Sequence, residues 1–161
     1  MSETGAAALA AHQLLGAYAW LVDERRWTEF GEVFTVDALA DYEAFTCRGT
    51  DELGSRMESI HAGLDATQHL IGSVLVTEAE GGLRVRSHVQ ATLVRRGFPG
   101  GGSVTVGARY DDRVVRGAGG WRIAERRTRG LWVRGNRAII PWMADRGGSD
   151  PSGSVLNGGD A

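Results

Sequence analysis

The sequence contains no lysine and only one cysteine, and both absences limit its chemistry. Apart from its four histidines, every basic residue is an arginine, so catalysis through a lysine Schiff base is excluded. The single Cys47 excludes an internal disulfide and a zinc site built from several thiolates. The 161 residues fit one domain and are numerous enough to bury a sizeable core.

Long apolar runs and an excess of positive charge are also missing. No apolar run approaches the roughly 20 residues that cross a bilayer, and Met1-Ser2-Glu3-Thr4 lacks the basic region of a signal peptide. We therefore expect a cytoplasmic protein without membrane contact. The formal net charge of −2 argues against nucleic acid as a partner. Arginines crowd residues 84–137, which leaves RNA binding as an alternative, but they alternate with apolar residues as on a solvated sheet face.

The first half of the chain has the apolar spacing of helices. This spacing predicts a helix over 6–23 and a short helix over 27–34. Residues 38–45 are typical of a short strand. A turn over 49–52 then leads into a third helix that runs to His61, with Thr50 as its N-cap.

The second half alternates between apolar and polar residues, which is typical of strands. The predicted strands are separated by glycine-rich loops and cover 67–77, 83–96, 103–116 and 121–134. The pattern predicts an α+β fold in which three N-terminal helices pack on a strongly curved, mostly antiparallel sheet, with a pocket between the layers. We expect one domain over residues 1–146 and a disordered Gly/Ser-rich tail over 147–161.

Four short fragments stand in a recognisable order along these elements. They are residues 18–23 followed by Trp27 and Phe34, residues 40–42, residues 67–72 and residues 120–123. In this order the chain resembles the nuclear-transport-factor-2-like superfamily, and within it the SnoaL-like branch that includes scytalone dehydratase and a bacterial dehydrochlorinase. The resemblance implies a cone-shaped α+β barrel. It is less specific for activity, because the fold hosts enzymes, binding modules and transport factors.

Asp23 and His69 are the candidate catalytic residues. Taken alone, Asp23 is typical of a solvated acid near a helix end, and His69 of a half-buried histidine bonded to a carbonyl. The resemblance implies a pair instead, since both the dehydratase and the dehydrochlorinase pair an aspartate at this position with the strand histidine. Such a carboxylate fixes the tautomer of the imidazole and stabilises the imidazolium that forms when it takes a proton.

Seven further residues are expected to bind the substrate: Tyr18, Tyr42, Met57, His88, Tyr110, Arg126 and Trp142. The resemblance implies that Tyr42 is a pocket tyrosine and that Arg126 lies near the leaving group. It also places Tyr18 where the dehydrochlorinase has an active-site lysine, and the lack of that lysine argues against halide elimination. His88 shares a face with Arg84 and Arg86, which is either the outer face or a polar wall of the pocket.

Other types of site have less support. Cyclases and ketosteroid isomerases of this fold carry a carboxylate base on a late strand, and Asp111 and Asp112 are the candidates here. One of these two neighbours must point inward on a regular strand, but we favour an outer-face ion pair. Residues 93–95 lack the second catalytic histidine of scytalone dehydratase, which argues against scytalone as substrate. The four histidines lack zinc-binding spacing and no phosphate loop is present, so we expect no cofactor and no metal.

These observations predict a cofactor-independent lyase, isomerase or cyclase of specialised metabolism that acts on a small, largely apolar ring or polyketide-like compound. His69 would act as base and then as acid, and Asp23 would orient it. Tyr42, His88 or Arg126 would stabilise the developing oxyanion. The alternative is a domain that binds a small ligand or dimerises without catalysis. A homo-oligomer, either a dimer or a trimer, is expected because exposed alternation on the long strands suits pairing of sheets.

Overall fold

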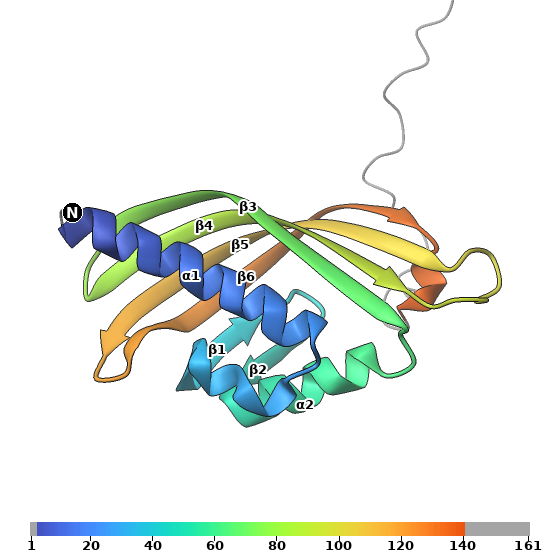
Figure 1. Cartoon of the computed structure of the whole chain (residues 1–161), viewed down its shortest axis with the longest axis horizontal. Helices are drawn as coiled ribbons and strands as arrows, with labels where there is room; N and C mark the ends of the chain where they lie inside the picture. Colours follow the sequence, from blue (N-terminus) through green and yellow to red (C-terminus); the bar gives the residue numbers. More distant parts are fainter. Residues whose placement is uncertain (1–2, 141–161) are drawn as a thin grey trace, which may run out of the picture.

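The computed structural model describes residues 3–140, which form helices packed on one curved six-stranded sheet (Figure 1). The strand order is β2 (Thr46–Arg48), β1 (Phe34–Asp41), β6 (Gly120–Gly135), β5 (Ser103–Gly117), β4 (Gly82–Val94) and β3 (Ala66–Ala79). The four predicted long strands lie side by side at one end of this order, and the short strands β1 and β2 extend the sheet beyond β6. The expected tail at 147–161 lies outside the described residues, so the predicted domain boundary stays a prediction.

Helix α1 (Glu3–Asp23) crosses one face of the sheet and packs closely against β3 (Figure 1). Its buried residues recur at helical spacing and include Ala11, Leu14, Tyr18, Leu21 and Val22. By length and mean hydropathy alone, residues 5–23 could also cross a membrane, although His12 and Gln13 interrupt the apolar run. Packing on the sheet accounts for this apolar composition, because the buried residues of α1 belong to the main hydrophobic core.

The segment after α1 differs in detail from the prediction. A 3₁₀ helix, η1 (Trp27–Glu32), replaces the predicted helix over 27–34, and strand β1 (Phe34–Asp41) begins before the predicted strand 38–45. The chain reverses over 42–45, where Glu43 has a φ of 62°, and returns as β2 (Thr46–Arg48). The predicted strand 38–45 was therefore wrong in its bounds, because a positive φ at Glu43 ends the extended conformation.

Helix α2 (Thr50–His61) has the predicted bounds, but its N-cap is Gly49 and not Thr50. Gly49 has a φ of 85°, and a Cβ there would lie 3.0 Å from the Val36 carbonyl oxygen, so glycine suits this turn. The Glu52 carboxylate accepts a hydrogen bond from the Arg48 backbone N–H at 2.8 Å. The buried side of α2 contains Leu53, Met57 and His61.

Four long antiparallel strands follow, close to their predicted positions: β3 (Ala66–Ala79), β4 (Gly82–Val94), β5 (Ser103–Gly117) and β6 (Gly120–Gly135). Strand β1 pairs with β6 in parallel, so the sheet is mixed, with one parallel pair. A short 3₁₀ helix, η2 (Arg137–Ile139), follows β6. Because the sheet is long and curved and the helices cover only part of its inner face, space remains between the two layers.

Candidate active site

A cavity of about 380 Å³ lies between the inner face of the sheet and the helices. Most of its lining is apolar and comes from strands β4 to β6 and from the turn at 42–45, and α2 contributes Met57, Ile60 and His61. The polar groups at its wall are few and include His69, Thr128 and three tyrosines, Tyr18, Tyr42 and Tyr110. A largely apolar cavity with a few polar groups is the usual form of a small-molecule site.

Asp23 and His69 are in direct contact at the edge of this cavity. The His69 Nδ1 lies 2.7 Å from Asp23 Oδ1, and Asp23 Oδ2 accepts the backbone N–H of His69 at 2.8 Å. The Thr67 hydroxyl donates a third hydrogen bond to Asp23 Oδ1 at 3.1 Å. The last residue of α1 is thereby fixed to β3 by three donors, so the position of the carboxylate is set by the packing of α1 on this strand.

These contacts determine the protonation of both groups. Burial alone would raise the pKa of Asp23, but the hydrogen bonds from the side chain and backbone of His69 and from Thr67 outweigh it, and the pKa is lowered. Asp23 is therefore ionised at neutral pH and can only accept. The neutral His69 ring must then carry its proton on Nδ1, which leaves the lone pair of Nε2 free.

Three tyrosines lie together on the cavity wall. The hydroxyls of Tyr18 and Tyr42 lie 3.0 Å apart, and the Tyr110 ring stands edge-on to the Tyr18 ring with the ring centres 5.9 Å apart. Burial, with the neighbouring Tyr18, raises the pKa of Tyr42 and Tyr110 well above its usual value, so both keep their protons. The contact between Tyr18 and Tyr42 uses one of the three hydroxyl protons, so at least one O–H remains available to an oxygen atom of a ligand.

Arg126 is fully buried behind this group of tyrosines. Its guanidinium carbon lies 4.2 Å from the centre of the Tyr18 ring and 4.0 Å from that of Tyr110. Nε and Nη2 donate to the two carboxylate oxygens of Asp112 at 2.8 and 2.7 Å, and both side chains are 0% exposed. Burial would lower the pKa of Arg126, but Asp112 raises it well above its usual value, so a fixed positive charge lies beneath the phenol rings.

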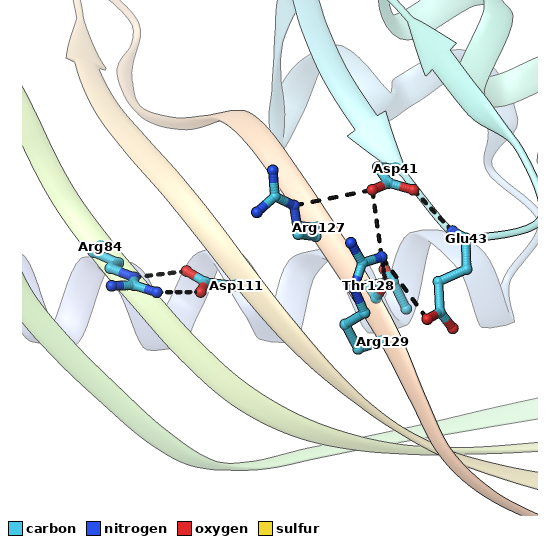
Figure 2. Close-up of polar contacts among 7 residues, drawn as sticks. All are labelled: Asp41, Glu43, Arg84, Asp111, Arg127, Thr128 and Arg129. Carbon is cyan, nitrogen blue, oxygen red and sulfur yellow. Dashed lines mark hydrogen bonds and ion pairs between the residues drawn. The ribbon is translucent and has the colours of Figure 1, made fainter.

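Two sequence predictions about these residues are corrected by the structure. Arg126 does not line the cavity, since the tyrosine rings stand between it and the open space. Asp112 forms a buried inner pair, and only its neighbour Asp111 pairs on the outer face, with Arg84 Nε at 2.8 Å (Figure 2). The outer-face interpretation was therefore wrong for Asp112, because alternation along β5 turns adjacent aspartates to opposite faces.

His88, also among the predicted substrate-binding residues, does not line the cavity. His88 is exposed, whereas the next residue, Val89, is 3% exposed and lines the cavity. Alternation along β4 thus places His88 on the outer face of the sheet. Arg127 and Arg129 point to that face too, where they approach Asp41 at 4.0 and 3.4 Å (Figure 2). Arginines of the arginine-rich stretch therefore form ion pairs with carboxylates on this face.

The remaining predicted residues divide into two groups. Tyr18, Tyr42, Met57 and Tyr110 line the cavity, and Trp142 lies outside the described residues. Sequence reasoning missed His61 as a site residue, although it lies four residues after Met57 on the inner side of the third predicted helix. It also missed Trp132, which lines the cavity from β6. Within residues 3–140 no cluster of three or more His, Cys, Asp or Glu side chains is placed to hold a metal ion.

Comparison with known proteins agrees with this architecture. A solved structure from Salmonella enterica, described as a nuclear transport factor 2 (NTF2-like) superfamily protein, has the same fold, with a TM-score of 0.71 and 14% identity over 80% of this chain and 94% of that one. The sequence model of the family described as "SnoaL-like domain" matches residues 4–127, and the chain belongs to this family. A search of curated proteins found no match.

Several solved structures are similar to this chain. The Kfla4162 protein from Kribbella flavida has a TM-score of 0.76 and 21% identity, over 82% of this chain and 95% of that one. A protein assigned as a scytalone dehydratase from Novosphingobium aromaticivorans has a TM-score of 0.70 and 22% identity, over 79% and 85%. A type 2 hexachlorocyclohexane dehydrochlorinase has a TM-score of 0.70 and 15% identity, over 80% and 87%. At these identities the similarity establishes the fold alone.

Proposed function

We propose that this protein is a cofactor-independent acid/base enzyme, a lyase, isomerase or cyclase, acting on a small, largely apolar ring compound. The observation that carries the proposal is the position of His69, which lines the cavity and holds its Nδ1 proton toward the ionised Asp23. Structural neighbours that are named as a dehydratase and a dehydrochlorinase support the same class of chemistry. The apolar lining of the cavity supports an apolar substrate.

The first step would be removal of a proton from a carbon beside a carbonyl or a leaving group. His69 Nε2 takes that proton, and the Asp23 carboxylate stabilises the resulting imidazolium through Nδ1–H. The electron pair of the broken C–H bond moves toward the carbonyl oxygen or expels the leaving group. The imidazolium then returns its proton to the leaving group, which completes an elimination, or to another carbon, which completes an isomerisation. Ring closure results instead when the carbanion attacks a second carbonyl.

The oxygen that gains negative charge in this step needs a hydrogen-bond donor. The three tyrosines supply one free O–H, and the Arg126 guanidinium behind the Tyr18 and Tyr110 rings favours negative charge on their side of the cavity. Arg126 thus acts through the tyrosines and does not touch the substrate. Tyr42 and Tyr110 keep their protons at neutral pH, so both remain donors through the reaction.

Proton abstraction can be tested without knowing the natural substrate. 1-Tetralone is a small ring ketone, and removal of its α-proton in D₂O followed by return of a deuteron gives a deuterated ketone that mass spectrometry detects. We expect exchange by the native protein above the buffer rate, and a loss of about 10²–10⁴-fold in His69→Gln. His88→Gln is the matched control, since it changes an exposed histidine on the outer face. Equal exchange by native protein and His69→Gln would refute the proposal.

The partners and location follow from the same reading and are also proposals. We propose a cytoplasmic protein whose partner is a small molecule, acting in specialised metabolism. Self-association as a dimer or trimer remains a prediction, and the solution mass from light scattering checks it. A domain that binds ligands without catalysis is the second candidate, favoured by the apolar lining of the cavity. Binding of 1-tetralone without deuterium exchange is the outcome that would select it.

A further inference from the structure

A second histidine, His61, faces the same cavity and has no role in the proposed proton transfer. It is the last residue of α2, its side chain belongs to the cavity lining, and the residue is only 4% exposed. The ring stacks obliquely beside Trp27, with the two ring centres 5.1 Å apart. His61 is therefore an ordered polar group in a mostly apolar wall, with a ring that packing holds in one orientation.

The backbone fixes the tautomer of this ring. His61 Nδ1 lies 2.7 Å from the carbonyl oxygen of Met57, one turn earlier in α2. A carbonyl oxygen only accepts, so Nδ1 must carry the proton and Nε2 of the neutral ring has a free lone pair. The bond to Met57 is the one hydrogen bond of the ring within residues 3–140, so Nε2 is the atom left for a ligand.

His61 differs from His69 in what lies behind the ring. His69 is supported by a carboxylate, which stabilises a positive charge, whereas His61 is supported by a neutral carbonyl. Burial lowers the pKa of His61 to about 4, and the nearby His69 and Arg25 add to this effect. His61 is therefore neutral at neutral pH, and its Nε2 accepts hydrogen bonds without taking the proton.

Arg25 holds the two histidines in a fixed relation. Its backbone has a φ of 60°, and its guanidinium donates to the carbonyl oxygens of His61 at 3.0 Å and Leu64 at 2.6 Å. These are carbonyls at and just beyond the C-terminal end of α2, which the helix itself leaves unpaired. Arg25 follows Asp23 by two residues. Its two hydrogen bonds therefore tie the end of α2 to the segment just after Asp23, whose carboxylate contacts His69.

We propose that His61 is a specificity-determining residue whose bare Nε2 accepts a hydrogen bond from a hydroxyl group of the ligand. The ligand would then be a hydroxyl-bearing ring compound, held by its hydroxyl at His61 while its reacting carbon faces His69. This inference rests on the proposed function for the role of His69, but the hydrogen bond at His61 is a binding property that needs no turnover. An ether in place of the hydroxyl would leave a buried acceptor without a donor.

A pair of matched probes tests this hydrogen bond. 1-Naphthol and 1-methoxynaphthalene differ only in the hydroxyl proton and a methyl group, and calorimetry gives the dissociation constant of each. We expect the native protein to prefer 1-naphthol by about 5- to 100-fold. His61→Phe, which keeps a flat ring beside Trp27, should reduce the preference to about twofold or less. The control His69→Phe should keep the preference, since the acceptor at His61 is still present.

A second measurement does not depend on the folding of any variant. In ¹⁵N NMR spectra of the native protein, the His61 Nε2 signal should have the shift of a bare imidazole nitrogen and move upfield on addition of 1-naphthol only. A protonated Nε2, an unchanged preference in His61→Phe, or failure to bind either probe would overturn the inference. If His69→Gln loses 1-tetralone exchange while any of these results is found, the proposed function stands and only this inference is removed.

Discussion

Removal of the negative charge from Asp112 should destabilise the protein strongly. The Asp112 carboxylate accepts two hydrogen bonds from Arg126, at 2.8 and 2.7 Å, with both side chains 0% exposed. Burial holds the pKa of Asp112 above its usual value although the Arg126 guanidinium opposes this, so the contact with Arg126 is what favours the carboxylate form. Asp112→Asn keeps the shape of the side chain but leaves a buried guanidinium without a counter-charge.

The expected loss for breaking one side of a buried ion pair is about 3–5 kcal/mol in the free energy of unfolding. For a domain of this size that loss lowers the melting temperature by about 10 °C or more. Urea unfolding monitored by tryptophan fluorescence measures it. Asp111→Asn is the matched control, since Asp111 is the neighbouring residue with the same chemistry, and its exposed pair with Arg84 should contribute less than about 1 kcal/mol.

A double variant separates stability from function. Asp112→Leu with Arg126→Met removes both charges together and should recover most of the loss caused by Asp112→Asn, because two apolar side chains can replace a buried pair at little cost. The same variant removes the cation beneath the Tyr18 and Tyr110 rings, so its exchange of 1-tetralone should fall although it folds. Similar small losses in Asp112→Asn and Asp111→Asn would refute this reasoning.

Two further predictions concern His61 and two glycines. The pKa of His61 is 6.5 in the unfolded chain and about 4 in the folded one, so folding releases a proton between these values and stability should fall by about 3 kcal/mol as pH drops from 6.5 to 4. His61→Phe should lose that slope in urea unfolding at several pH values, and an unchanged slope would contradict the burial argument. Gly107→Ala should destabilise the protein by about 1–3 kcal/mol, because its Cβ would lie 2.1 Å from Trp132. Gly16→Ala should stabilise α1 by about 0.5–1 kcal/mol, because nothing lies within 4 Å of its Cβ. The melting temperatures of the two variants should therefore shift in opposite directions.

The fold was predictable because its long elements carry strong periodic patterns. The apolar spacing in 6–23 and the alternation from 67 onward gave α1 and the strands β3 to β6 close to their observed bounds. The hairpin of β1 and β2 was not predictable, since it depends on a positive φ at Glu43, a residue type that rarely adopts it. The parallel pairing of β1 with β6 joins segments about 85 residues apart, and no local pattern reports it.

The contact between Asp23 and His69 was predictable because a resemblance named both residues, and their catalytic role stays a prediction. Alternation alone predicts that adjacent residues of a strand face opposite sides of the sheet, but it does not predict which side is the inner one. The expected outer-face ion pair was therefore right for Asp111 and wrong for Asp112, and His88 was left open between two faces. His61 lay on the expected inner side of its helix, yet its tautomer and its low pKa depend on the Met57 carbonyl and on burial, which only the structure provides.

The central claim is that Asp23 holds the His69 ring with its proton on Nδ1 and its lone pair on Nε2 toward the cavity. The most direct measurement is the ¹⁵N NMR spectrum of the His69 imidazole at neutral pH, in the native protein and in Asp23→Asn. The account predicts a slowly exchanging Nδ1–H and a bare Nε2 in the native protein, and a mixture of tautomers in the variant. A proton on Nε2 in the native protein, or identical spectra for the two proteins, would contradict it.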